Sequence, residues 1–208
     1  MKIKRYTPLK LLAALIYSMS VYSCSLITTS EKSGSIGVVI SEPDRIQFQG
    51  KGAGAGVALM STMGPVGIAI GVAIDEGIAV DLRDVAAKAG FSIQNAIVTS
   101  LTQTSYNSST VIFDAADSHQ TYLVIKNYGF RSVAGDGDPT HVEIALQLFK
   151  DGELLRSVNY PSDLPDSHGF KTAPLDNLRQ DGVLVRRLLE EGFTDSIALL
   201  FSQQKLAE

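Results

Sequence analysis

Apolar and polar residues alternate with a period of two along residues 142–149. This alternation predicts a strand that buries one face, because successive side chains of a strand point to opposite sides. Asp151-Gly152 follows, and this dipeptide is typical of a two-residue hairpin turn. We therefore predict that residues 154–160 return as an antiparallel strand. The inward-facing set of the first strand comprises Val142, Ile144, Leu146 and Leu148.

Three more short segments have the composition of strands, at residues 36–40, 110–113 and 121–131. They are rich in β-branched and aromatic residues. In the third segment, strict alternation predicts Leu123 and Ile125 on one side of the strand. The other side is then expected to carry Tyr122, Val124, Lys126, Tyr128 and Phe130.

Helical spacing replaces alternation in residues 78–101 and again in 175–201. Apolar residues there recur at steps of three and four, as in a helix with one buried face. Gly90 divides or bends the first helix, and Gly182 and Gly192 weaken the second, so that two helices can form there. The element order predicts an α+β fold, with a small, mainly antiparallel sheet and helices packed on one of its faces.

Residues 50–77 form a segment rich in glycine and apolar residues, and no charge lies between Gly52 and Ile74. Its glycines recur at four-residue spacing, which leaves bare backbone on one helix face and lets a second helix approach closely. The segment resembles the glycine-zipper stretches of bacterial envelope proteins. The glycines expected to serve this helix packing are Gly50, Gly52, Gly54, Gly56, Gly64, Gly67 and Gly71.

Three interpretations of this segment remain open. A single helix of this length would insert into a membrane or mediate self-association. A break at Met63-Gly64-Pro65 would instead give an apolar hairpin or loop packed on the domain, because proline interrupts a helix. A phosphate-binding loop is the weakest interpretation, since the segment lacks both the Gly-Lys-Ser/Thr end of a P-loop and a full dinucleotide fingerprint.

The first 23 residues have the layout of a secretory signal peptide. A basic start that includes Lys4 and Arg5 leads into an apolar stretch that ends at about Val21. Cys24, the single cysteine of the chain, follows directly after the small residue Ser23. A lone cysteine cannot form an internal disulfide, and its free thiol is a liability in an oxidising compartment. The position of Cys24 therefore indicates a specific modification.

Val21-Tyr22-Ser23-Cys24 resembles the lipobox of bacterial lipoproteins. The resemblance implies that residues 1–23 are removed and that Cys24 carries acyl chains, which bind membrane lipid. Residues 24–35 then form a flexible tether to an α+β domain at 36–208. A residue other than aspartate after the cysteine, here Ser25, implies anchoring in the outer membrane, facing the periplasm.

Charge and motifs narrow the function further. Residues 24–208 hold 14 basic and 22 acidic residues, a formal net charge of −8, which argues against a nucleic acid partner. The sequence contains no serine-nucleophile elbow and no zinc-binding His-Glu-x-x-His motif.

Possible metal ligands are badly spaced. His141 and His168 lie far apart, in predicted loops or at strand starts. The group Asp114, Asp117 and His119 lacks the spacing of metal ligands. A calcium loop that starts at Asp136 would have Gln147 at its twelfth position, where such a loop needs glutamate. We therefore predict no catalytic residue, no metal and no cofactor.

Together these features predict a lipid-anchored, non-enzymatic protein of the bacterial cell envelope. It would serve as a structural or accessory component of an envelope or transport assembly. Its Gly-rich segment would contact the membrane, an envelope protein or a second copy of the chain. The alternative is a lipid-anchored periplasmic enzyme or ligand-binding protein, whose site would assemble from residues far apart in the sequence.

Overall fold

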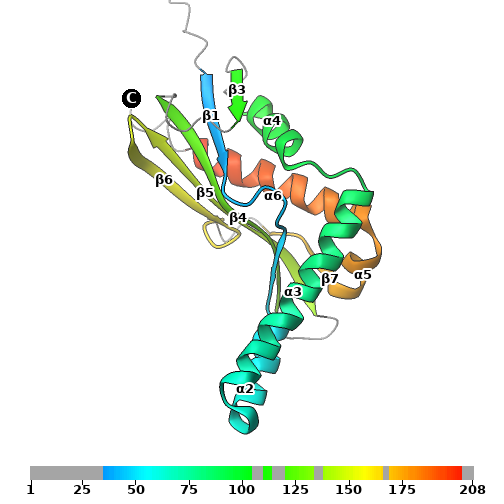
Figure 1. Cartoon of the computed structure of the whole chain (residues 1–208). Helices are drawn as coiled ribbons and strands as arrows, with labels where there is room; N and C mark the ends of the chain where they lie inside the picture. The colour runs from blue at the N-terminus through cyan, green and yellow to red at the C-terminus, as the bar shows by residue number, and fades with distance from the viewer. Residues whose placement is uncertain (1–34, 105–109, 114–119, 134–137, 166–168, 203–208) are drawn as a thin grey trace, which may run out of the picture. The chain divides into compact units, whose positions relative to one another are not determined.

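The alternating segments assemble into a mixed sheet. The computed structural model describes residues 35–104, 110–113, 120–133, 138–165 and 169–202. Within these residues the sheet has seven strands in the order β3-β1-β4-β5-β6, with β2 beside β4 and β7 beside β5 (Figure 1). The strands are β1 Ser35–Ile40, β2 Gln47–Gln49, β3 Thr110–Phe113, β4 Thr121–Ser132, β5 Pro139–Lys150, β6 Glu153–Tyr160 and β7 Thr172–Pro174.

The predicted α+β class is confirmed, but the sheet is mixed rather than mainly antiparallel. β4, β5 and β6 pair antiparallel, as the alternation and the Asp151-Gly152 turn predict. β1 runs parallel to both β3 and β4, and β2 runs parallel to β4. The chain passes through three helices between β2 and β3, and a long crossover of this kind returns the chain in the same direction.

Five helices complete the described part of the chain. They are α2 Lys51–Met63, α3 Pro65–Lys88, α4 Ile93–Gln103, α5 Leu175–Gln180 and α6 Gly182–Ser202. Gly90, at a φ of +75°, separates α3 from α4. Ser92 caps α4 by accepting a hydrogen bond from the Asn95 backbone N–H. Gly182 begins α6, whereas Gly192 lies inside α6 and packs closely on Val142.

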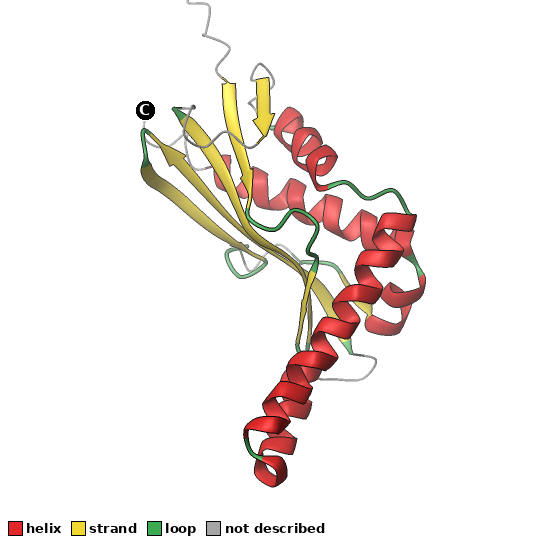
Figure 2. Ribbon diagram, in the orientation of Figure 1, coloured by secondary structure: helices red, strands yellow, loops and turns green. Residues whose placement is uncertain are grey.

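Helices α3, α4, α5 and α6 share one apolar core with the sheet and lie on one of its faces (Figure 2), whereas no α2 residue belongs to that core. All four β5 residues predicted to face inward are buried. On the opposite side of the β4–β5 pair, Tyr122 stacks on Phe149 with ring centroids 4.9 Å apart. One face of the central strands therefore carries the core.

A β-bulge in β4 overturns part of the predicted facing pattern. The pairing of β4 with β5 shifts register between Ile125 and Asn127. The extra residue returns Tyr128 and Phe130 to the core side, where both are buried together with Leu123 and Ile125. The prediction that Tyr128 and Phe130 face away from Leu123 was wrong, because strict alternation does not anticipate a bulge.

Candidate functional site

The Gly-rich segment forms a helical hairpin. α2 ends at Met63, Gly64 adopts a φ of +61°, and Pro65 occupies the first turn of α3. This position suits proline, which lacks the N–H that the first turn leaves unpaired. The single-helix interpretation is therefore wrong. The segment is a hairpin, but its large apolar side chains are exposed rather than packed on the domain. In the part of the chain that the structure describes, none of the helices has both the length and the apolarity to cross a membrane.

Four glycines bring the two helices of the hairpin into backbone contact. A Cβ atom on Gly52 would lie 1.8 Å from the carbonyl oxygen of Gly71, and one on Gly71 would lie 2.3 Å from that of Gly52. A Cβ on Gly67 would lie 2.6 Å from the backbone of Leu59 and Met60, and one on Gly56 would lie 3.3 Å from the Gly67 oxygen. The glycine spacing thus serves packing within one chain.

The other three predicted packing glycines do not lie in this contact. A Cβ on Gly54 or Gly64 would meet nothing within 4 Å. Gly54 faces away from α3, and Gly64 instead provides the turn. Gly50, at a φ of +129°, approaches Ser132 at the end of β4, where a Cβ would lie 2.3 Å from the Ser132 oxygen.

A carboxylate from α3 holds the start of α2. Asp75 accepts hydrogen bonds from the backbone N–H groups of Gly52, at 2.6 Å, and Gly50, at 3.3 Å. Lys51 forms an ion pair with Asp138, which precedes β5. The N–H groups that a phosphate would need are thus bound to an acidic side chain, which argues against the phosphate-loop interpretation.

Charged residues surround the base of the hairpin. Glu76 pairs with Arg83 at 2.5 Å and with Arg45 at 3.4 Å. The hydrogen bond from Arg83 is the main reason that the pKa of Glu76 lies below its ordinary value. We call Lys51, Asp75, Glu76, Arg45 and Arg83 the charged base of the hairpin.

Beyond the charged base, the hairpin is apolar and exposed. Val57 is 71% exposed and Val72 is 65% exposed, although both are large apolar side chains. Exposed large apolar side chains that gather on one element mark an interaction site. We call this set the apolar hairpin surface; it comprises Val57, Met60, Met63, Val66, Ile68, Val72 and Ile74.

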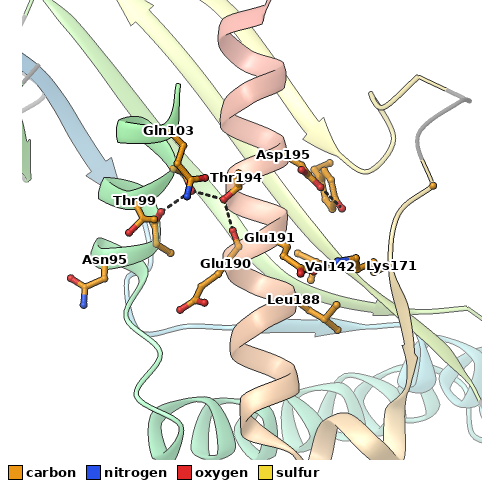
Figure 3. Close-up of a pocket in the computed structure, with 14 residues that line it drawn as sticks. Asn95, Thr99, Gln103, Val142, Lys171, Leu188, Glu190, Glu191, Thr194 and Asp195 are labelled. Atoms are coloured by element: carbon orange, nitrogen blue, oxygen red, sulfur yellow. Dashed lines mark hydrogen bonds and ion pairs between the residues drawn. The ribbon is translucent and has the colours of Figure 1, made fainter. Parts of the chain in front are cut away.

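A second candidate site is a cleft of about 600 Å³ beside α6 (Figure 3). Side chains reach it from α4, α6, β5 and β6, and from the segment that precedes β7. Lys171 pairs with Glu191 Oε1 at 2.8 Å, and the Tyr160 hydroxyl lies 3.5 Å from Asp195 Oδ2. Burial and the Asp195 carboxylate raise the pKa of Tyr160 to about 12.

Among the described residues that line it, the cleft has polar groups but no nucleophile paired with a base. Ser100 Oγ lies 3.1 Å from Thr194 Oγ1, and these hydroxyls also donate to carbonyls of their own helices. Glu191 Oε2 is buried without a hydrogen-bond partner among the described residues. No local sequence signal marks this cleft, because its residues come from five separate segments.

The remaining predicted positions lie elsewhere. Cys24, Asp114, Asp117, His119, Asp136 and His168 fall outside the described residues. His141 is buried on β5, with its ring 5.0 Å from that of Phe170, and burial is the main cause of its lowered pKa. Within the described ranges, no group of three or more histidine, cysteine or acidic residues is placed to hold a metal ion.

Comparison with known proteins gives one distant likeness. No family model and no curated protein sequence matches the chain. Among solved structures, the fold is similar to a chain of the PelC dodecamer from Paraburkholderia phytofirmans. The two chains are 12% identical with a TM-score of 0.35, over 81% of this chain and 89% of that one. At this distance the likeness does not bear on function.

Proposed function

We propose that this protein is a lipid-anchored, non-enzymatic component of the bacterial cell envelope, with a structural or accessory role in an envelope or transport assembly. Acyl chains on Cys24 would hold it in the outer membrane, facing the periplasm. The apolar hairpin surface would make the contact through which it acts. That surface is the observation that carries the accessory role, because an exposed apolar surface of this kind serves binding rather than the stability of the domain.

The N-terminal sequence supports the anchor independently. Cys24 is the single cysteine and stands where the lipobox of a lipoprotein has its modified residue. Several acyl chains on one residue bind a bilayer stably, since each buried CH₂ contributes about 0.8 kcal/mol.

Mass spectrometry of the protein isolated from bacterial membranes tests the anchor. The expected product begins at Cys24 and carries a diacylglyceryl group and an N-linked acyl chain. A mature protein that is recovered from the soluble fraction with an unmodified Cys24 would overturn the proposal.

The cleft beside α6 favours a second candidate, a lipid-anchored ligand-binding protein. The observation behind it is the unpaired Glu191 Oε2 together with the protonated Tyr160 hydroxyl at the same cleft. A cationic or hydroxyl-bearing ligand would satisfy that oxygen. Thermal-shift screening of the wild type and of Glu191→Gln would detect it, because binding to the folded state raises Tm.

A further inference from the structure

We propose that the α2–α3 hairpin inserts into a single leaflet of a phospholipid bilayer and gives the protein a second membrane attachment besides Cys24. The inference rests on the proposed function, because the acyl anchor is what brings the domain to a membrane. Residues 52–74 would lie among the acyl chains of that leaflet.

The distribution of small and large residues is that of an element surrounded by lipid. The contact between the two helices is made by Gly52, Gly56, Gly67 and Gly71, so the small-residue faces are already used within the hairpin. Valine, methionine and isoleucine side chains point outward instead. Docking against a second copy or one protein groove would require only one apolar side. Here both helices expose apolar residues along their lengths.

The length of the hairpin matches one leaflet. α2 has 13 residues, which corresponds to about 20 Å at 1.5 Å per residue. The hydrocarbon region of a bilayer is about 30 Å thick, so one leaflet is about 15 Å. The turn at Gly64 would therefore reach the middle of the bilayer and not the far side.

Polar groups near the turn are satisfied inside the hairpin, as a hydrocarbon environment requires. Ser61 Oγ donates to the Ala58 carbonyl at 2.8 Å, and Thr62 Oγ1 donates to that of Leu59 at 3.1 Å. The backbone N–H of Gly64 donates to Met60 at 2.9 Å. The turn therefore enters lipid without leaving these donors unpaired.

The charged base of the hairpin sets the depth of insertion. Asp75 of α3 accepts hydrogen bonds from Gly50 and Gly52 at the start of α2. The charged residues that bound the apolar segment, Lys51 on α2 and Asp75 on α3, therefore lie at the same distance from the turn. Farther from the turn, Glu76 pairs with both Arg45 and Arg83. Charges are costly in hydrocarbon, so this level corresponds to the lipid headgroups.

The segment between Cys24 and Ser35 is long enough for the acyl anchor and the hairpin to occupy the same leaflet. β1 enters beside the first residues of β4, whereas Gly50 lies beside Ser132 at its last residue. The twelve residues of β4 span about 36 Å. The eleven steps from Cys24 to Ser35 reach about 36–40 Å when extended. The acyl anchor and the hairpin can thus occupy the same leaflet, with the tether close to its full reach.

Depth-dependent fluorescence quenching tests the inference. The chain contains no tryptophan, so a single introduced tryptophan reports one position. Residues 25–208 are exported behind the signal peptide of a soluble periplasmic protein, which leaves them without acyl chains. Vesicles of phosphatidylethanolamine and phosphatidylglycerol carry bromine either deep in the acyl chain or near the headgroup. We expect deep bromine to quench Met63→Trp most strongly and shallow bromine to quench Val72→Trp.

A matched pair of charge substitutions provides the control. Val57→Asp should lower vesicle binding by about 100-fold, because a charge is placed in hydrocarbon. Val183→Asp, at an exposed valine on α6, should leave binding unchanged. Circular dichroism would show that both variants fold.

The outcomes separate the inference from the proposed function. Insertion would be overturned if both bromine positions quenched the tryptophans at 63 and 72 equally. It would also be overturned if neither tryptophan were quenched and light scattering showed that the protein is a dimer. Neither result would affect the acyl modification of Cys24, which is measured on the full-length protein. Conversely, an unmodified Cys24 would overturn the anchor while the vesicle result stands.

Discussion

Gly52 on α2 and Gly71 on α3 lie against each other so closely that neither position has room for a methyl group. The Cβ of an alanine at Gly52 would lie 1.8 Å from the Gly71 oxygen, well inside van der Waals contact. The two helices can therefore pack this closely only if both positions are glycine. The same contact brings Asp75 to the start of α2.

Substitution of these glycines should open the hairpin. We expect Gly71→Ala to lower the free energy of unfolding by about 1–3 kcal/mol, because the new methyl forces the helices apart. Hydrogen exchange should show faster exchange of the α2 amides. Gly54→Ala on α2, the other helix of the hairpin, is the matched control, since its Cβ would meet nothing within 4 Å. It should stabilise by about 0.5–1 kcal/mol; equal destabilisation by both variants would contradict the assigned contact.

Asp75 should be needed to hold the start of α2. Asp75→Ala removes the acceptor of the Gly50 and Gly52 N–H groups, and a lost helix cap of this kind costs about 0.5–2 kcal/mol. Urea denaturation measures the loss. Asp84→Ala changes an exposed carboxylate on the same helix and should alter stability little. If the two variants lose the same stability, the loss in Asp75→Ala does not come from the hydrogen bonds to Gly50 and Gly52.

Stability should fall in strongly alkaline solution because of two buried tyrosines. Burial raises the pKa of both Tyr128 and Tyr160 to about 12, whereas unfolded tyrosine titrates near 10. The folded state therefore keeps protons that the unfolded state loses, and stability declines as pH rises from about 10 to 12. Each tyrosine would account for about 2–3 kcal/mol.

Phenylalanine substitution isolates this effect. Tyr160→Phe removes the hydroxyl beside Asp195, and Tyr128→Phe removes the donor to the Pro43 carbonyl at 2.6 Å. Each variant should show a shallower decline of Tm between pH 10 and 12 than the wild type. An unchanged slope in both variants would show that other groups cause the decline.

The length of the tether should limit hairpin insertion in the acylated protein. Deletion of residues 27–32 shortens the reach between Cys24 and Ser35 to about 18 Å, less than the span of β4. Quenching of Met63→Trp by deep bromine should then decrease. The same deletion in the unacylated chain should have no effect, because no anchor opposes the hairpin. A decrease in both chains would point to damage of the domain instead.

Much of the fold follows from local pattern. The strands β1, β3, β4, β5 and β6 were predicted because their apolar composition or period is visible over four or more residues. Gly90 separates two helices, as the sequence allowed. β2 and β7 were missed because each has three residues, too few to show a period. The bulge between Ile125 and Asn127 was missed because it depends on pairing with β5, which is a long-range property.

The candidate sites were predictable to different degrees. The glycine spacing predicted close helix packing, but spacing alone does not say which glycines face the partner helix. Gly54 has the same spacing to Gly50 as Gly52 has to Gly56, yet only Gly52 and Gly56 contact α3. The cleft beside α6 was not predicted, since Lys171 and Glu191 meet only in the folded chain.

The position of β1 and β2 on β4 determines how the domain would respond to tension. Residues 35–50 connect the proposed tether to the hairpin, and their strands β1 and β2 both pair parallel with β4. If membrane motion pulled the two attachments apart, this segment would carry the load along its own axis. Its hydrogen bonds to β4 would be sheared together rather than opened one at a time, while β5, β6 and α6 would lie outside the path of the force.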